Sequence, residues 1–248
     1  MYQEQRLSKI LSLLDEHKEL SSKEMMHYFN VSRDTIRRDF TILSERNLVR
    51  RTHGGIIPIE KDNQIPSFND RISELTQEKK AIAQKATTFI QENNIYFFDV
   101  STIILNVAQL IDSQITIYTH SLDNAIVLSQ PKNHTVHLLG GKFYPKNRFY
   151  YSLNESELLQ KTNFDVAFFG AAGLKNGEVS FEDSEDAYLK QLVMTRAKTK
   201  ILLAEQKKFQ QSSNYAIGTV NDFDYLITDE KPQKHLQQLF SKEITIIY

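Results

Sequence analysis

The sequence predicts a small, mainly helical N-terminal domain, followed by a larger α/β domain with a mostly parallel sheet. Apolar residues recur at helical spacing through the first 45 residues, whereas beyond residue 75 short apolar runs alternate with helical patterns. Between these regions, the stretch from Pro58 to Pro66 is polar and shows no periodicity, which is typical of a linker. We therefore expect one domain at 1–57, a linker at 58–74 and a second domain at 75–248.

The composition is that of an ordinary globular protein, with 40% hydrophobic and 25% charged residues and a net charge of −1. Residues 1–55 carry ten basic and eight acidic side chains, and the remainder carries 20 basic and 23 acidic ones, so positive charge is concentrated at the N-terminus. The absence of cysteine excludes disulfides, thiol catalysis and cysteine-ligated zinc. We find no secretory signal and no apolar run of membrane length, and we expect a cytoplasmic protein.

Three helices are predicted in the N-terminal region. Apolar residues recur at helical spacing from Gln3 to Glu16. Ser21 and Glu24 can form a capping box at the start of a short second helix that ends near Phe29. Ser32 is a suitable N-cap for a third helix, and the brief turn before it is typical of a helix-turn-helix.

The third helix has two different faces. Ile36, Phe40 and Leu43 form an apolar stripe that faces a core. Off this stripe, guanidinium groups can bind guanine edges or phosphates, and a threonine methyl can contact a thymine methyl. Such a basic face is often only solvated, but the helix-turn-helix context favours double-stranded DNA as the partner. The candidate DNA-binding residues on this helix are Ser32, Arg33, Thr35, Arg37 and Arg38.

A short β-hairpin is predicted after the third helix. From Leu48 to Ile57, apolar and β-prone residues flank the pair Gly54-Gly55, which favours a wing beside the helix-turn-helix. Basic residues near its tip can contact phosphates or a minor groove, although a turn-stabilising hydrogen bond explains the histidine equally well. The candidate wing contacts are Arg50, Arg51, His53 and Gly54.

Beyond the linker, the alternation of segments predicts a largely parallel sheet covered by helices. We predict helices at 78–91, 102–110, 122–129 and 183–198, and strands at 95–98, 115–118, 135–139, 166–169, 200–204 and 225–227. Ligands of such sheets bind beyond the carboxyl ends of the strands, and hydroxyl groups and amides at helix N-termini can hold a phosphate there. Plain helix capping is the commoner role of serine and threonine in these loops. For His120, a hydrogen-bonded loop residue is the simpler interpretation. The candidate ligand-binding residues are Asp99, Ser101, Thr102, His120, Ser121, Gly140, Gly141, Gly170 and Lys208.

The N-terminal motifs resemble those of the DeoR family of bacterial regulators of sugar metabolism. The resemblance rests on Thr35-Ile36-Arg37-Arg38-Asp39-Phe40 and on the stretch from Leu48 to Gly55. It implies a winged helix-turn-helix that binds operator DNA, generally to repress transcription. Because a repeated or inverted operator needs two winged domains, we expect a homodimer or homotetramer held by the large domain.

The remainder of the chain resembles the effector domain of the same family, which is related in fold to ribose-5-phosphate isomerase and senses phosphorylated sugars. The family's Asp-x-Gly-Thr-Thr loop corresponds to Asp99–Ile103, its Thr-Asn-Ser loop to Thr119–Ser121, and its Asp-x-x-Lys-Phe motif to Glu205–Phe209. Ser101 stands in place of a glycine, and Ile103 in place of a threonine. Two alternatives therefore stay open: operator binding modulated by a sugar phosphate, and a DNA-binding regulator whose effector site has degenerated.

An aldose–ketose isomerase is a third alternative, and the sequence argues against it. Such an enzyme needs a carboxylate that takes a proton next to a carbonyl group. The related isomerases carry an Asp-Gly-Ala-Asp-Glu cluster where this chain has Phe169-Gly170-Ala171-Ala172-Gly173, so we expect no enzyme. The sequence also contains no GxGxxG or P-loop motif and no metal-ligand spacing of histidines, so we expect no cofactor or metal.

An aromatic stretch runs from Phe143 to Tyr151 on either side of Pro145. A hairpin at a subunit interface and a lid over the ligand pocket are both consistent with it. Stacking on single-stranded nucleic acid is the weaker alternative, because the stretch and its flank contain few cations.

Overall fold

The computed structural model describes residues 3–46, 48–58, 70, 76–130 and 133–248 of the chain. It contains two compact units, Met1–Gln64 and Ile65–Tyr248, and each is described by itself. Most of the expected linker at 58–74 lies outside the described residues, so the two boundaries between the three expected segments stay a prediction. Within the described residues, no helix combines the length and apolarity needed to cross a membrane.

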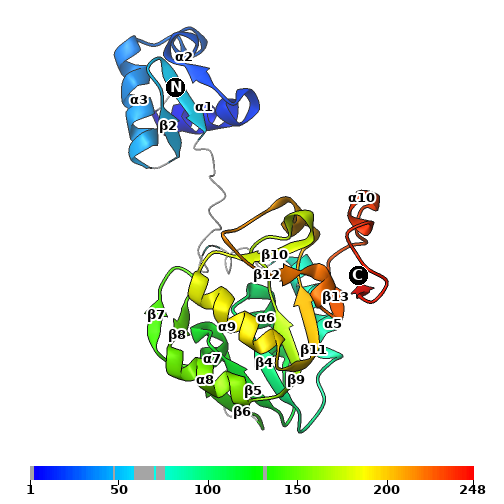
Figure 1. The fold of residues 1–248 in the computed structure, drawn as a ribbon. Coiled ribbons are helices and arrows are strands. Elements are labelled where there is room, and N and C mark those ends of the chain that lie inside the picture. The colour runs from blue at the N-terminus through cyan, green and yellow to red at the C-terminus, as the bar shows by residue number, and fades with distance from the viewer. Residues whose placement is uncertain (1–2, 47, 59–69, 71–75, 131–132) are drawn as a thin grey trace. The chain divides into compact units, whose positions relative to one another are not determined.

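The described part of the N-terminal unit contains three helices and a small antiparallel sheet (Figure 1). The helices are α1 (Gln3–His17), α2 (Ser22–Phe29) and α3 (Arg33–Glu45). The sheet has the strand order β1 (Leu20–Ser21), β3 (Gly55–Pro58), β2 (Val49–Arg51). The helix-turn-helix and the wing formed by β2 and β3 confirm the prediction, whereas the sequence pattern does not predict β1.

Short-range hydrogen bonds set the helix boundaries of this unit. Ser21 Oγ accepts from the amide of Glu24 at 3.1 Å, and the Glu24 carboxylate accepts from the amide of Ser21 at 2.9 Å, which confirms the capping box. Asn30 ends α2 in the left-handed conformation with φ 51°. Ser32 Oγ accepts from the amide of Thr35 at 3.2 Å and begins α3 as predicted.

A single apolar core holds the N-terminal unit together. Ile36, Phe40 and Leu43 of α3 are fully buried and pack with Leu7 and Ile10 of α1. Burying a large apolar side chain stabilises a fold by about 1.5–3 kcal/mol, so the stripe fixes which face of α3 turns inward. The opposite face is left to solvent.

The large unit is built on a parallel sheet of seven described strands, in the order β14-β13-β11-β9-β4-β5-β6 (Figure 1). The strands are β4 (Ile95–Phe98), β5 (Thr116–Thr119), β6 (Thr135–Leu138), β9 (Phe164–Phe169), β11 (Ala197–Leu203), β13 (Tyr225–Ile227) and β14 (Thr245–Ile247). Two antiparallel pairs lie outside this sheet: β7 (Lys142–Tyr144) with β8 (Phe149–Tyr151), and β10 (Glu178–Phe181) with β12 (Tyr215–Thr219). The helices are α5 (Gln77–Thr87), α6 (Thr102–Leu110), α7 (Leu122–Leu128), α8 (Leu153–Lys161), α9 (Ser184–Met194) and α10 (Lys234–Gln237).

Side chains alternate between two cores on the two faces of this sheet. Phe97 of β4 packs in the core that includes residues of α8 and α9, and Tyr96 and Phe98 pack in the core that includes residues of α5 and α6. The strand order reverses between β4 and β9, because β5 and β6 extend from β4 on one side and β11 extends from β9 on the other. A switch point of this kind is where open α/β sheets bind ligands.

The predicted helix at 183–198 is wrong in its last part. α9 ends at Met194, and Ala197 already belongs to β11, where it pairs with Phe164 of β9. The polar segment 197–200 suits a helix by propensity, but pairing within the sheet overrides that preference. The predicted helix at 78–91 also ends early, at Thr87, and the pattern does not predict α8, β10, β12 or β14.

Candidate functional site

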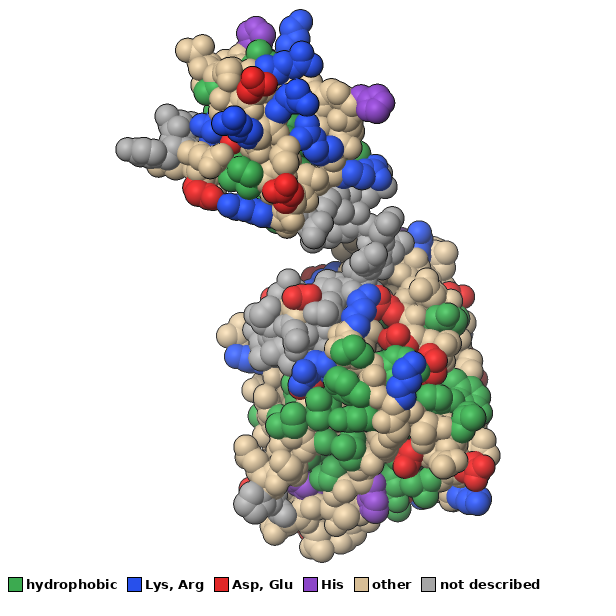
Figure 2. All heavy atoms as spheres, turned by 90° about the vertical axis from the view of Figure 1, so that its left-hand side faces the viewer, with side chains coloured by type: hydrophobic (Ala, Val, Ile, Leu, Met, Phe, Trp, Pro, Cys, Tyr) green, Lys and Arg blue, Asp and Glu red, His purple; other side chains and the backbone are tan. Residues whose placement is uncertain are grey.

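The outer face of α3 carries exposed basic side chains. Arg33, Arg37 and Arg38 are exposed, and among the described residues no acidic side chain forms an ion pair with them. The hydroxyl of the partly buried Thr35 lies 2.9 Å from Ser32 Oγ. Figure 2 shows the side of the N-terminal unit on which α3 lies in Figure 1, and Lys and Arg side chains gather there.

A groove of about 450 Å³ runs along this face. Arg37 and Arg38 of α3 line it together with Arg51 of the wing, and Asp34 is the acidic residue in its lining. Three guanidinium groups against one carboxylate favour an anion such as a DNA phosphate.

The wing is attached to α3 by one of its arginines. Arg51 Nη1 donates to Thr41 Oγ1 at 2.7 Å and to the carbonyl oxygen of Arg37 at 3.4 Å. Arg50 and His53 are exposed, and neither side chain has a hydrogen-bond partner within the described part of the chain. Arg51 is therefore placed to orient the wing, while Arg50 and His53 are free to reach a ligand.

The two glycines of the wing have different roles. Gly54 is exposed, its carbonyl accepts from the amide of Ser22 at 2.8 Å, and a Cβ added to it would meet no atom within 4 Å. A Cβ on Gly55 would lie 2.0 Å from the carbonyl oxygen of Leu20, because β1 pairs with β3 at this point. The close approach of these two strands therefore requires glycine at 55.

A buried ion pair, which sequence reasoning missed, joins α3 to α1. Asp39 is fully buried although it follows the exposed Arg38, and both of its carboxylate oxygens accept from Arg6, at 3.0 Å for Nη2–Oδ1. Hydrogen bonding to Asp39 raises the pKa of Arg6. Asp39 lies three residues after the buried Ile36, and this spacing was the available signal that it points inward.

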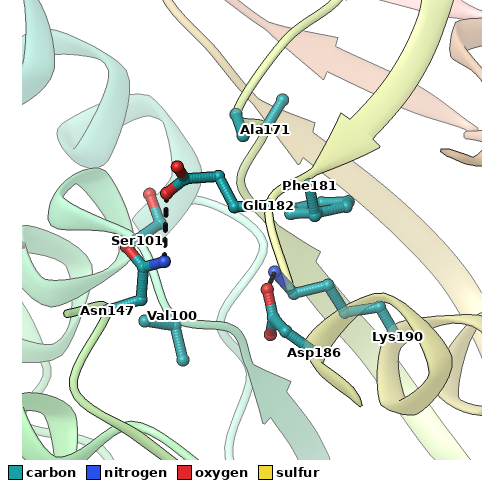
Figure 3. A pocket seen from close by; sticks show the side chains of 9 residues that line it. Val100, Ser101, Asn147, Ala171, Phe181, Glu182, Asp186 and Lys190 are labelled. Atoms are coloured by element: carbon teal, nitrogen blue, oxygen red, sulfur yellow. Dashed lines mark hydrogen bonds and ion pairs between the residues drawn. The ribbon is translucent and has the colours of Figure 1, made fainter. Parts of the chain in front are cut away.

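In the large unit, a small cavity lies at the switch point between β4 and β9. Its volume of about 30 Å³ is enough for about two water molecules. Side chains from the loops after β4 and β9, from the β7–β8 hairpin, from β10 and from α9 surround it (Figure 3). The lining residues are Val100, Ser101, Asn147, Ala171, Ala172, Phe181, Glu182, Asp186 and Lys190.

A buried network of four ionisable side chains supports the cavity. Lys190 Nζ lies 2.9 Å from Asp99 Oδ1 and 2.6 Å from Asp186 Oδ2, and 3.5 Å from the ring centroid of Phe181. His120 Nε2 lies 2.8 Å from Asp186 Oδ1 and donates its proton, since an ionised carboxylate only accepts. Burial alone would raise the pKa of Asp186, but Lys190 and His120 outweigh burial and lower it.

The network does not fit a metal ion. Asp99, His120 and Asp186 offer ligand atoms within 4.8 Å of one another. The Lys190 ammonium, however, is within hydrogen-bond distance of both carboxylates and already supplies the compensating positive charge. Asp186 and Lys190 were not predicted, because nothing in their local sequence distinguishes them from other helix residues.

Asp99 joins the two loops of the switch point. Its Oδ1 accepts from the amide of Val100 at 2.5 Å, and its Oδ2 accepts from the amide of Gly170 at 2.9 Å. Ser101 Oγ accepts from the amide of Ile103 at 3.2 Å and so caps α6. A Cβ on Gly170 would lie 2.7 Å from Ser101 Cβ, so the contact between the loops requires a glycine at 170.

The tip of the β7–β8 hairpin forms one wall of the cavity. Asn147 Nδ2 donates to Glu182 Oε2 at 3.1 Å (Figure 3). It also donates to Asp183 Oδ2 at 2.8 Å, and Lys146 Nζ lies 2.6 Å from Glu182 Oε1. Burial raises the pKa of Asp183 despite the hydrogen bond from Asn147. A hairpin is one of the interpretations that the aromatic pattern leaves open, but the sequence offers no signal that its tip meets these acidic residues.

Three predicted residues are buried beside the cavity and do not line it. His120 stacks on Phe97 with a centroid separation of 5.6 Å. Ser121 is the N-cap of α7, and Thr102 is the first residue of α6. Their positions agree with helix capping and with a hydrogen-bonded loop histidine.

The remaining predicted ligand-binding residues of the large unit, Lys208, Gly140 and Gly141, are not part of the cavity lining. Lys208 Nζ donates to Gln211 Oε1 at 2.9 Å and to the carbonyl oxygen of Ala172 at 3.4 Å, so it holds the loop after β9. Gly140 and Gly141 connect β6 to β7, and Gly141 has a φ of 117° with no room for a Cβ beside Tyr151. Of the predicted residues, Ser101 lines the cavity, and Asp99, His120 and Gly170 contact its lining.

Comparison with known proteins gives matches over both units. The sequence model of the DeoR-like helix-turn-helix domain matches residues 6–62, and that of the DeoR C terminal sensor domain matches residues 74–230. The chain is 32% identical to the HTH-type transcriptional repressor GlcR of Bacillus subtilis, over 98% of this chain and 94% of the relative. It is 26% identical to the glycerol-3-phosphate regulon repressor of Escherichia coli, over 97% and 96%. The full-length sorbitol operon regulator SorC of Klebsiella pneumoniae aligns in structure with a TM-score of 0.41 and 10% identity, over 94% of this chain and 97% of that one.

Proposed function

The chain belongs to the DeoR family of DNA-binding transcription regulators, and from that premise we propose that it represses an operon for carbohydrate use. The proposed partner is double-stranded operator DNA, and the proposed signal is a phosphorylated sugar. Membership of this family makes the chain a regulator and not an enzyme. Such a regulator acts in the cytoplasm, where its operator lies.

The observation that supports operator binding is the exposed basic face of the N-terminal unit. Arg37 and Arg38 lie beside the fully buried Ile36, so the core fixes their outward direction. We propose that α3 enters the major groove and that Arg50 and His53 of the wing contact the backbone or the minor groove. Ser32, Arg33, Thr35, Arg51 and Gly54 complete the proposed surface.

Fluorescence anisotropy with the DNA upstream of its own gene tests this proposal. We expect tight, sequence-selective binding that weakens as salt rises, and replacement of Arg37 and Arg38 by alanine should abolish selectivity. The matched control is Lys161→Ala, which removes an exposed charge from the large unit. Equal affinity of the wild type for this DNA and for an unrelated duplex would contradict the proposal.

The large unit is proposed to sense the effector at the cavity between β4 and β9. Support comes from its place at the switch point and from its lining, which mixes a hydroxyl, an amide and charged groups. One relative is named for the regulon of glycerol 3-phosphate, a phosphorylated polyol. An effector can change operator affinity only if it binds one conformational state of the protein more tightly than the other. The change in the free energy of operator binding cannot exceed that difference in the free energy of effector binding.

A degenerated effector site is the second candidate, and Ser101 favours it. Its Oγ accepts from the amide of Ile103, so this amide at the start of α6 already has an acceptor in place of an effector phosphate. Thermal shift with a panel of sugar phosphates separates the two, because a bound ligand raises the melting temperature. If the wild type gives no shift but Ser101→Gly does, the site has degenerated.

We propose that the active form is a homodimer or homotetramer held by the large unit. The reason is functional, since one winged domain reads one half of a repeated or inverted operator. Sedimentation of the free protein and of its operator complex tests the stoichiometry, and a monomer in both would contradict it.

A further inference from the structure

We infer that Glu182 binds the hydroxyl groups of a polyhydroxylated, sugar-like effector, and that Lys146 and Asn147 compete with the effector for this carboxylate. The inference rests on the proposed function of the large unit as a sensor. It names the chemistry that the cavity selects and the contact that effector binding breaks.

The cavity can enclose a sugar phosphate only if one of its walls moves. Its 30 Å³ compares with several hundred Å³, about 300 or more, for sites that enclose a small molecule. The walls after β4 and β9 are tied together, because the Asp99 carboxylate accepts from the amides of Val100 and Gly170. The wall formed by Asn147 is held differently, by side-chain contacts at the tip of a hairpin.

The tip of the hairpin, Lys146 and Asn147, can move away from the cavity while the base of the hairpin stays in place. Arg148 forms a two-point ion pair with Asp123 of α7, at 2.7 and 2.8 Å, and the amide of Tyr150 donates to the carbonyl oxygen of His120 at 2.9 Å. These contacts anchor the hairpin from Arg148 onward. Lys146 and Asn147 precede this anchor and contact the residues that follow β10.

The charge of the cavity favours hydroxyl groups on this side. Glu182 and Asp186 line it, and the single lysine in its lining, Lys190, is already shared between Asp186 and Asp99. Once Lys146 has left Glu182, this wall is negative, so it repels a phosphate and accepts hydrogen bonds from hydroxyl donors. On the opposite wall, the described lining residues are Val100, Ser101 and the alanines after β9, none of them acidic, and this is the side for a phosphate.

Hairpin and effector would satisfy the same carboxylate. In the closed state Glu182 accepts from Asn147 and pairs with Lys146. If the tip leaves, this largely buried carboxylate exchanges the donors of the tip for water or for donors of a ligand. Adjacent hydroxyl groups of a sugar supply such donors. The two states exclude each other, so the effector shifts the hairpin toward its open position.

The experiment measures ligand affinity in variants that change either the Glu182 carboxylate or one of the two hairpin residues that contact it. A panel of hexose and pentose phosphates, glycerol 3-phosphate, their unphosphorylated parents and inorganic phosphate is first screened by thermal shift on the full chain. Isothermal titration with the best compound then gives Kd for Glu182→Gln, Asn147→Ala, Lys146→Met and the control Glu178→Gln, an exposed residue of β10. Circular dichroism melting checks that each variant folds.

We expect the Glu182 variant and the two hairpin variants to change Kd in opposite directions. Glu182→Gln should weaken binding by roughly tenfold or more, because a hydrogen bond to a charged acceptor is lost. Asn147→Ala and Lys146→Met should tighten binding several-fold, since less of the closing contact must be broken. Glu178→Gln should leave Kd unchanged. A deoxy analogue should bind the wild type more weakly but lose little more in Glu182→Gln.

Two results overturn the inference, and they differ. If a panel compound binds but Glu182→Gln matches the wild type, or changes Kd in the same direction as both hairpin variants, Glu182 does not read the ligand and the sensor function stands. If no compound shifts the melting temperature of the wild type, the proposed effector function fails together with this inference. Should Asn147→Ala not fold, Lys146→Met alone carries the comparison, because Lys146 is exposed.

Discussion

The carboxylate of Asp39 is completely buried and accepts hydrogen bonds at both of its oxygens from Arg6, although the neighbouring Arg38 is exposed. This pair ties the middle of α3 to α1, one residue from the side chains proposed to reach DNA. The orientation of the recognition surface therefore depends on a polar contact as well as on the apolar stripe.

Asp39→Ala should destabilise the N-terminal unit by about 3 kcal/mol or more, because it removes the buried carboxylate that compensates the charge of the largely buried Arg6. Urea unfolding followed by circular dichroism measures the change. The matched control is Glu4→Gln, which removes the exposed ion pair with Arg46 between the same two helices and should behave like the wild type. Equal losses in the two variants would show that burial of the pair does not matter.

Arg50→Ala should weaken operator binding and make the slope of log K against log salt less negative by about 0.9, the value for one phosphate contact. Arg50 has no partner within the described residues, so its removal should leave the melting temperature unchanged. Arg51→Ala should also lower the stability of the wing, since Arg51 donates to Thr41. Anisotropy titrations between 50 and 200 mM salt, roughly the range over which such contacts weaken, provide the slopes. An unchanged slope for Arg50→Ala would remove this residue from the interface.

Gly170→Ala should destabilise the large unit by about 1–3 kcal/mol, the usual cost of overpacking, because its Cβ would lie 2.7 Å from Ser101 Cβ. Combining it with Ser101→Gly should restore most of this stability, since the clashing side chain is then absent. Gly140→Ala is the control, as a Cβ there meets no atom within 4 Å. Additive losses in the double variant would contradict the direct contact.

Asp183→Asn should raise the stability of the protein at pH 7 and have no such effect near pH 3. Burial raises the pKa of Asp183 in the folded state, so between the ordinary value of about 3.9 and the raised one the folded protein binds more protons than the unfolded chain. The contribution of Asp183 to the free energy of unfolding therefore falls as pH rises through this window. The asparagine of the variant does not ionise, so the variant does not lose this stability. Melting temperatures of both proteins across pH 3–7, about the span of the titration, test the sign. A constant difference at all pH values would contradict it.

Much of the fold follows from local patterns in the sequence. The segment 102–110 is helical and the segments 95–98 and 225–227 are strands, with the bounds that the periodicity predicts. The capping residues Ser21 and Ser32 start their helices because the groups that they bind lie three residues away in the chain. Such contacts hardly depend on the rest of the fold.

The cavity is only partly predictable, because its walls come from segments that are distant in the chain. The sequence predicts that loops after parallel strands share an edge, and Asp99 and Gly170 do meet there. It does not predict that α9 and the β7–β8 hairpin bring Lys190, Glu182 and Asn147 to the same point. Segments 183–198 and 142–151 are separated from the β4 loop by long stretches of chain, and no local preference encodes their approach.

The sequence by itself determined the helix-turn-helix, the wing, the outward face of α3 and the edge of the sheet that carries the candidate ligand-binding loops, because spacing and capping act over a few residues. The tertiary structure alone decided that Asp39 turns inward to Arg6, that Lys190 pairs with both Asp99 and Asp186, and that the tip of a hairpin meets Glu182 at the cavity. These contacts join side chains whose charges must be compensated once they are buried together, and only the packing of distant elements determines which charges meet.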